Sequence, residues 1–225
     1  RSLLVTSTRS EEGKTSTSVA LAMAFARSGR SVLVIDADMR KPSFVAEAGS
    51  SIGLSGLLTR DSSLPDHIVS STTKGLSLLP AGTIPPNPAE LLSSQRIHDL
   101  IREAESMFDL VLIDSPPVLS FADAPILGSI CEGTLVVIQS GAIRTPAALH
   151  TMGRLMDAKS NLIGTILTKF DAEQAGYDFG YGYYAYGRAA YGYGADSVKQ
   201  SSGARKKIDI VSENTPEDTL EDIRS

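Results

Sequence analysis

The sequence has no tryptophan and no initiator methionine, and it carries one cysteine, Cys131, among 225 residues. A lone cysteine forms no intramolecular disulfide, which is typical of a reducing compartment, and its apolar neighbours predict a core position. No apolar run reaches the 18 residues that span a bilayer, and no secretory signal is visible. These absences predict a cytoplasmic chain. Because Arg1 directly precedes an apolar run, we expect a fragment of a longer polypeptide.

The chain also lacks an excess of positive charge. Its net charge is −5, which gives no electrostatic case for nucleic acid as a partner. With 42% apolar and 21% charged residues, it has the composition of a globular protein with one main core. We expect a folded domain over residues 1–172, a flexible Gly- and Tyr-rich tail over 173–194, and a disordered polar and acidic end over 195–225.

Short β-rich apolar runs alternate with segments of helical period, a pattern that predicts an α/β fold with a parallel sheet flanked by helices. We expect helices over Thr15–Arg27, stopped by Gly29, over Ala89–Glu105 and over Pro146–Ala158. The expected strands are Leu3–Ser7, Ser31–Ile35, Leu76–Leu79, Leu110–Ile113, Thr134–Ile138 and Leu162–Thr168.

A phosphate-binding loop is expected between the first strand and the first helix, where the sequence reads TRSEEGKT from Thr8 to Thr15. Such a loop points backbone N–H groups and a helix N-terminus at one spot. Lys14 would reach the β- and γ-phosphates, and the Thr15 hydroxyl would ligate Mg²⁺. Thr8 replaces the first glycine of the usual pattern, which implies a variant backbone path. Glu11 and Glu12 are expected to point to solvent.

Three aspartates follow apolar strands: Asp36 and Asp38 after the second, and Asp114 after the fourth. Because ligands bind at the carboxyl ends of strands in an open α/β sheet, we expect these carboxylates to meet the Gly-Lys-Thr loop at one edge and to suit Mg²⁺. The alternative is that they are turn or helix-capping residues.

With these motifs, the chain resembles the bacterial tyrosine kinases of capsule and exopolysaccharide synthesis, within the deviant-Walker P-loop ATPases that include ParA and MinD. Thr8–Thr15 is similar to the Walker A loop, Val32–Pro42 to the Walker A′ segment and Phe108–Val118 to Walker B. The stretch GTIPPNPAELL, from Gly82 to Leu92, is similar to one typical of the kinases.

The resemblance implies an ATP-dependent protein-tyrosine autokinase with ATP and Mg²⁺ as cofactors. It assigns Lys14, Asp36, Asp38, Asp114 and Arg40 to catalysis, with Asp38 accepting the tyrosine proton and Arg40 positioning phosphate or substrate. It implies Thr15, Asp36 and Asp114 as metal ligands. The loop residues expected at the nucleotide are Ser10, Glu11, Glu12, Gly13, Lys14, Thr15 and Ser16.

The tyrosines are absent from the first 176 residues and fall together in the tail. The expected phosphate acceptors are Tyr177, Tyr181, Tyr183, Tyr184, Tyr186, Tyr191 and Tyr193. A tyrosine hydroxyl is neutral at pH 7, so transfer needs a nearby carboxylate to take its proton. The alternative is a sticky aromatic-glycine segment without an acceptor role.

The resemblance also implies transfer between neighbouring subunits of a homo-oligomer. Further expected partners are a transmembrane adaptor, fused or separate, and a tyrosine phosphatase, at the cytoplasmic face of the inner membrane. Two departures are visible: the family's E-x-x-R-x-x-R oligomerisation motif is missing, and Thr168-Lys169 stands where a base-contacting Asn is often found. A ParA/MinD-like ATPase switch and a non-catalytic scaffold for polysaccharide export are the competing hypotheses.

The three histidines, His67, His98 and His150, show no spacing that suggests metal ligation or a nucleophile relay. Surface positions are expected for all of them.

Overall fold

The structure is a computed structural model that describes residues 1–44, 53–60 and 62–171. Its centre is a seven-stranded sheet in the order β3-β4-β2-β5-β1-β6-β7, in which every neighbouring pair is parallel except β3 and β4. The strands are β1 (Ser2–Ser7), β2 (Val32–Asp36), β3 (Val69–Ser70), β4 (Leu76–Leu79), β5 (Leu110–Asp114), β6 (Gly133–Gln139) and β7 (Leu162–Thr168).

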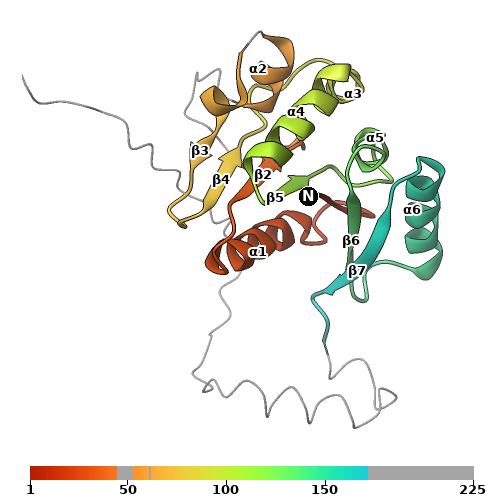
Figure 1. Ribbon diagram of the computed structural model, residues 1–225. Coiled ribbons are helices and arrows are strands. Elements are labelled where there is room, and N and C mark those ends of the chain that lie inside the picture. Colours follow the sequence, from red (N-terminus) through yellow and green to blue (C-terminus); the bar gives the residue numbers. More distant parts are fainter. Residues whose placement is uncertain (45–52, 61, 172–225) are drawn as a thin grey trace, which may run out of the picture.

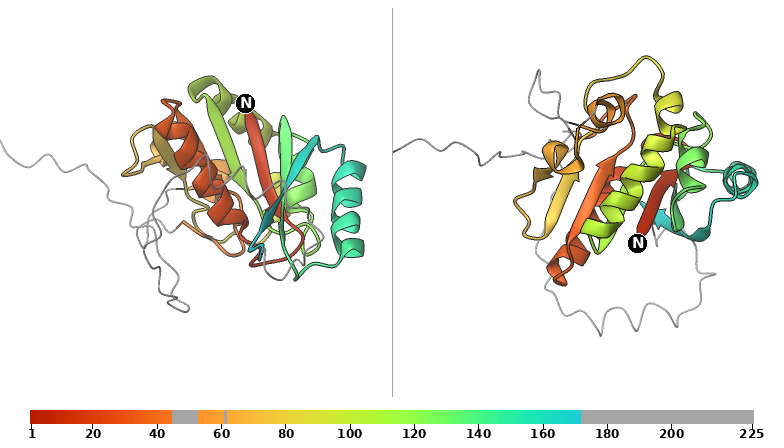
Figure 2. Two further views of the ribbon diagram at one scale, coloured as in Figure 1. Left: turned by 90° about the horizontal axis from the view of Figure 1, so that it is seen from below. Right: turned by 45° about the horizontal axis from the view of Figure 1, so that its top comes forward.

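Helices cover both faces of the sheet, so the domain has three layers (Figures 1 and 2). The helix α1 packs on one face against β1, β2 and β5, whereas α4, α5 and α6 pack on the other. The helices are α1 (Lys14–Arg27), α2 (Leu54–Thr59), α3 (Pro88–Leu92), α4 (Gln95–Met107), α5 (Asp123–Gly128) and α6 (Thr145–Asp157), with a 3₁₀ turn η1 (Leu64–His67).

The central strands are apolar because helices bury both of their faces. All five residues of β2 are buried, and their side chains alternate between two cores: Leu33 and Ile35 face α4, while Val32 and Val34 face α1. The helix α4 is amphipathic, and its buried stripe includes Ile97, Ile101 and Ala104. This packing fixes the carboxyl ends of β1, β2 and β5 at one edge, where the expected site lies.

The α/β fold class predicted from the sequence is confirmed, and the first helix ends at Arg27 with Gly29 in the left-handed region at φ 90°. Cys131 is buried in the core, as expected. Within the described ranges, no helix combines the length and apolar composition needed to cross a bilayer.

One expected helix is wrong: Ala89–Glu105 is broken at Ser93 and Ser94 into α3 and α4. Ser94 has an extended backbone at φ −75° and ψ 157°, which ends the helical path, and its hydroxyl donates to the Leu91 carbonyl at 2.7 Å in place of a later helical N–H group. The expected surface position of His67 is also wrong, because this side chain is buried. The tail and acidic end lie outside the described residues.

Candidate active site

The loop after β1 leads directly into α1, whose first residue is Lys14. Gly13 precedes the helix at φ 96°, a left-handed conformation that favours glycine and lets the chain turn from the loop into the helix. The N-terminal N–H groups of α1 therefore point toward the carboxyl edge of the sheet. This is the backbone arrangement that binds phosphate oxygens.

Lys14 lies between two of the expected aspartates. Its Nζ is 3.4 Å from Oδ2 of Asp38 and 3.6 Å from Oδ2 of Asp114, and all three side chains are almost fully buried. The Thr15 hydroxyl donates to Oδ2 of Asp114 at 2.5 Å, and the Ser18 hydroxyl lies 3.3 Å from Oδ1 of the same carboxylate. The structure thus brings Lys14, Thr15, Asp38 and Asp114 together.

Asp36 completes this cluster from the next strand. It stands opposite Asp114 in the parallel register of β2 and β5. Its carboxylate accepts three backbone N–H groups: Asp38 at 3.1 Å on Oδ1, and Ser43 at 2.7 Å and Phe44 at 3.0 Å on Oδ2. These bonds shape the turn after β2 and hold Asp38 beside Lys14.

Burial makes ionisation of the carboxylates costly. It raises the pKa of Asp36 to about 7, and the charge of Asp114 adds to the rise, while the backbone N–H groups oppose it. Burial also raises the pKa of Asp114, and the positive charge of Lys14 is the largest effect that lowers it. Two neighbouring buried carboxylates with raised pKa values are an environment in which a bound cation is favoured.

The donor set fits Mg²⁺ better than a metal held by protein alone. Among the described residues, no group of three or more His, Cys, Asp or Glu side chains is placed to hold a metal ion. Magnesium is usually bound through one or two carboxylates together with waters and substrate phosphates. The hydroxyl of Thr15 and the carboxylates of Asp36 and Asp114 are the hard oxygens that could serve such a site.

Arg40 lies at the same edge but is engaged elsewhere. Its guanidinium forms a two-point ion pair with Asp123, from Nε to Oδ2 at 3.1 Å and from Nη2 to Oδ1 at 3.2 Å. It also stacks over Phe121, with 4.3 Å to the ring centroid. The structure therefore joins Arg40 to the segment that begins α5. A role at phosphate or substrate stays a prediction.

The two loop glutamates differ. Glu11 is exposed, as expected, but Glu12 is buried, and the expectation that it points to solvent is wrong. Its carboxylate accepts the backbone N–H groups of Arg9 and Gln139, the latter at 3.1 Å. Glu12 thus ties the loop to the end of β6, and burial raises the pKa of its carboxyl. Ser10 and Ser16 are exposed.

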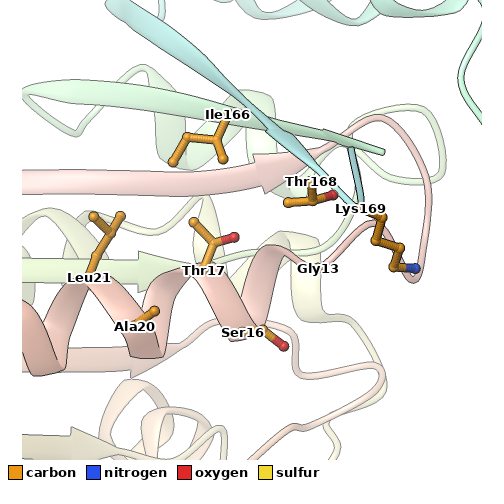
Figure 3. A pocket seen from close by; sticks show the side chains of 8 residues that line it. All are labelled: Gly13, Ser16, Thr17, Ala20, Leu21, Ile166, Thr168 and Lys169. Atoms are coloured by element: carbon orange, nitrogen blue, oxygen red, sulfur yellow. The ribbon is translucent and has the colours of Figure 1, made fainter. Parts of the chain in front are cut away.

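A hollow of about 510 Å³ opens beside the loop, between α1 and β7 (Figure 3). Its mainly apolar wall includes Ala20, Leu21 and Ile166. It is lined by Gly13, Ser16, Thr17, Ala20, Leu21, Ile166, Thr168 and Lys169. The hollow starts where the phosphate-binding loop ends, so a ligand held by the loop can extend into it.

Sequence reasoning missed several residues that shape this site. Ser18 lies one turn after Lys14 and bonds Asp114, a position that helical spacing could have flagged. Asp123 lies far from Arg40 in the sequence, and nothing local distinguishes it. The sequence located Thr168 and Lys169 at the end of the last strand but gave no sign of their hydrogen bonds to the loop. The seven tail tyrosines are outside the described residues, so the structure does not place them.

The fold and the site together define a class. Residues 3–181 match the CobQ/CobB/MinD/ParA nucleotide binding domain, and the chain belongs to that P-loop class. It is 40% identical over 188 residues to the tyrosine-protein kinase YwqD of Bacillus subtilis (strain 168), a match that covers 82% of this chain and 77% of the relative. Within its class, the chain belongs to the bacterial tyrosine-protein kinases.

Solved structures agree with this assignment. The VpsO kinase domain aligns with a TM-score of 0.71 at 32% identity, covering 76% of this chain and 85% of that chain. The BceF tyrosine kinase domain aligns with a TM-score of 0.68 at 39% identity, covering 74% of this chain and 68% of that chain. The family and fold class expected from the sequence motifs are confirmed.

Proposed function

We propose that the chain is an ATP-dependent protein-tyrosine autokinase that phosphorylates its own C-terminal tyrosines and so regulates the synthesis or export of an exopolysaccharide or capsule. One observation carries the proposal: Lys14, Thr15, Asp36, Asp38 and Asp114 converge at one sheet edge in a member of the tyrosine-protein kinases. Three carboxylates beside one lysine and a helix N-terminus suit a cation-bound polyphosphate.

The loop and the start of α1 would bind the triphosphate. Backbone N–H groups from Ser10 to Ser16 would face the phosphate oxygens, and Lys14 would leave its two aspartates to reach the β- and γ-phosphates. Thr15, Asp36 and Asp114 would hold Mg²⁺. When bound, this ion supplies neutralisation of the charge on the transferred phosphoryl group.

Asp38 is the proposed acceptor of the tyrosine proton. Its Oδ1 accepts the Lys41 N–H at 3.0 Å, which fixes the carboxylate, and its Oδ2 faces Lys14. During transfer the proton of the tyrosine hydroxyl would pass to this carboxylate. The phenolic oxygen then bonds the γ-phosphorus, the bond from that phosphorus to the bridging oxygen breaks, and ADP leaves.

The hollow beside the loop is the proposed place for the adenosine end of ATP. It adjoins Gly13 and Ser16, and the apolar side chains of Ala20, Leu21 and Ile166 offer a surface for a flat base. The hollow would thus bind the adenine base in a chain that has Thr168-Lys169 at the position where the family often has a base-contacting Asn.

The acceptors in this proposal are Tyr177, Tyr181, Tyr183, Tyr184, Tyr186, Tyr191 and Tyr193, and the tail of one copy would enter the site of its neighbour. A transmembrane adaptor, fused or separate, would place the kinase at the cytoplasmic face of the inner membrane, and a tyrosine phosphatase would reverse the modification. Support for these partners comes from the resemblance to capsule and exopolysaccharide kinases.

The test is to incubate the purified chain with Mg-ATP and to map phosphotyrosine by mass spectrometry. We expect phosphate on tail peptides, with the signal lost in Lys14→Met and retained in Lys74→Met, which changes an exposed lysine away from the site. A variant with all seven tail tyrosines changed to Phe should bind Mg-ATP without incorporating phosphate.

Hydrolysis of ATP without phosphotyrosine would favour the ATPase switch instead. Absence of Mg-ATP binding by the correctly folded chain would overturn the proposal as a whole.

A further inference from the structure

Three carbonyl groups of the phosphate-binding loop accept hydrogen bonds from side chains of the neighbouring strands or the residue after them. The Ser7 hydroxyl donates to the carbonyl of Arg9 at 2.6 Å. Two consecutive residues at the end of β7 donate to two consecutive backbone carbonyls of the loop. Lys169 Nζ donates to the carbonyl of Glu11 at 2.9 Å, and the Thr168 hydroxyl donates to the carbonyl of Glu12 at 2.6 Å.

Holding a carbonyl also orients the next N–H group. In a planar trans peptide the C=O of one residue and the N–H of the next point in opposite directions, and no cis peptide occurs among the described residues. Lys169 therefore turns the N–H of Glu12 away from β7, and Thr168 does the same for the N–H of Gly13. These two N–H groups lie directly before Lys14, where a phosphate group is expected.

The loop needs such support because its backbone conformation is unfavourable for one of its residues. Glu11 has φ 69°, in the left-handed region that is strained for a residue with a side chain. Its own side chain gives little help, since the nearest ion pair, to Lys41 at 3.9 Å, is exposed on both partners. The carbonyl of this strained residue is the one that Lys169 holds.

The support is itself anchored in the sheet. Lys169 Nζ also donates to Oε1 of Gln139 at 2.8 Å, at the end of β6. The buried carboxylate of Glu12 accepts the N–H groups of Gln139 and Arg9. Figure 3 shows Thr168 and Lys169 beside the loop at Gly13. The ends of β6 and β7 thus fix the loop from its outer side.

We propose that Thr168 and Lys169 are positioning residues for the phosphate-binding loop, and that Lys169 in particular stabilises the left-handed conformation of Glu11. The inference rests on the proposed nucleotide site, because it concerns affinity for the phosphate chain. In this chain, two side chains from the end of β7 hold a conformation that a glycine at position 11 would adopt without strain.

A competing explanation is direct contact between Lys169 and the nucleoside, since Lys169 also lines the hollow. The two roles of Lys169 can be distinguished by measuring affinity for ligands with and without a base. Support of the loop affects any bound polyphosphate, whereas contact with the base affects only ATP. Mg-tripolyphosphate, which has no base, is therefore the deciding probe.

The experiment measures affinities of the full chain for Mg-ATP and Mg-tripolyphosphate by calorimetry. Loss of one hydrogen bond to the loop should weaken both ligands about 3- to 10-fold in Lys169→Met and in Thr168→Val. Lys169→Arg and Thr168→Ser keep a donor and should bind nearly as the unchanged chain does. The matched control is Lys159→Met. Lys159 is an exposed lysine after α6, and its φ of 62° is close to the φ of 51° at Lys169.

The link to Glu11 is tested by repeating Lys169→Met in two backgrounds. In Glu11→Gly the strain is gone, so the Lys169→Met loss should fall below about 2-fold. In Glu11→Ala the carboxylate is gone but the strain remains, so the loss should stay near its full size.

Hydrogen exchange of the nucleotide-free chain gives an independent readout. Amides of residues 9–13 should exchange faster in Lys169→Met than in Lys159→Met. A loss confined to Mg-ATP, an equal loss in the Gly and Ala backgrounds, or unchanged loop exchange would each overturn the inference. If the unchanged chain binds neither ligand, the proposed function fails, and exchange alone still decides whether Lys169 holds the loop.

Discussion

The hydroxyl of Thr15 donates a hydrogen bond of 2.5 Å to Oδ2 of Asp114, across the gap between α1 and β5. The two side chains come from segments 99 residues apart in the sequence. Their pairing places a neutral oxygen and a carboxylate oxygen at the point where a phosphate-bound cation is expected. We therefore predict that the function of Thr15 depends on its hydroxyl and not on the size of its side chain.

Thr15→Val should weaken Mg-ATP binding about 10-fold or more, because a methyl group replaces an oxygen that pairs with a charged group. Thr15→Ser should stay close to the unchanged chain. Calorimetry with ATP in the presence and absence of Mg²⁺ checks this, and the difference between the variants should appear only with the metal. Equal Mg-ATP affinity for Val and Ser would contradict the assignment.

Arg40 and Asp123 form a second long-range pair, which ties the turn after β2 to the start of α5. Asp123 is fully buried, so removing Arg40 leaves a buried carboxylate without this cation. Because Arg40 is about one-third exposed, we expect Arg40→Met to cost about 2 kcal/mol of unfolding free energy, below the usual range for deeply buried pairs.

A double-mutant cycle with Asp123→Asn isolates this pair. The double variant should be less destabilised than the summed single variants by about 1 to 2 kcal/mol, measured by urea unfolding. Strictly additive effects would show that the ion pair contributes nothing. Lys41→Met, one residue along and exposed, is the control, and it should change stability by less than about 0.5 kcal/mol.

The sequence was sufficient for the layered fold, because long apolar strands and amphipathic helices have clear periods. The meeting of the expected carboxylates was also predictable, since Asp36 and Asp114 end parallel strands and such ends share one edge. Short elements escaped: β3 has two residues and α5 has six, too few to show a period. The break at Ser93 escaped because the polar residues between Leu92 and Ile97 include no proline or glycine that would mark a helix end.

Contacts between distant segments could not be read from the sequence. Glu12 looked like a solvated charge, yet its carboxylate is held by Arg9 nearby and by Gln139, 127 residues away. Lys169 meets Glu11 across 158 residues. These long-range partners are set by the pairing of β6 with β1 and of β7 with β6, which no local sequence pattern predicts.

His67 is another residue whose buried contacts were not predicted from the sequence, and these contacts lead to a test. Its Nδ1 accepts the N–H of Gly53 at 3.0 Å, and its Nε2 lies 2.9 Å from the Ser62 hydroxyl. Replacing it by Phe leaves the buried N–H of Gly53 without this acceptor, at a cost of about 1 to 3 kcal/mol in unfolding free energy. His150→Phe, at an exposed position, should stay within about 0.5 kcal/mol. Urea midpoints that coincide for the two variants would refute this role.

Cys131 makes stability depend on alkaline pH. Burial raises the pKa of its thiol from an ordinary 9.0 to about 12, and the nearby charge of Glu105 adds to the rise. Above pH 9 the unfolded chain therefore loses this proton while the folded chain keeps it. Since the unfolded state then binds fewer protons, the free energy of unfolding falls as pH rises, by up to about 1.4 kcal/mol per unit.

Cys131→Ala removes this dependence and adds a cavity cost that does not vary with pH. Between pH 8 and 10.5 the variant should gain about 2 kcal/mol relative to the unchanged chain, as measured by urea unfolding at each pH. Other groups titrate in both proteins and cancel in the difference. A constant difference across this range would mean that the thiol ionises as readily in the folded chain as in the unfolded one, which its position in the core opposes.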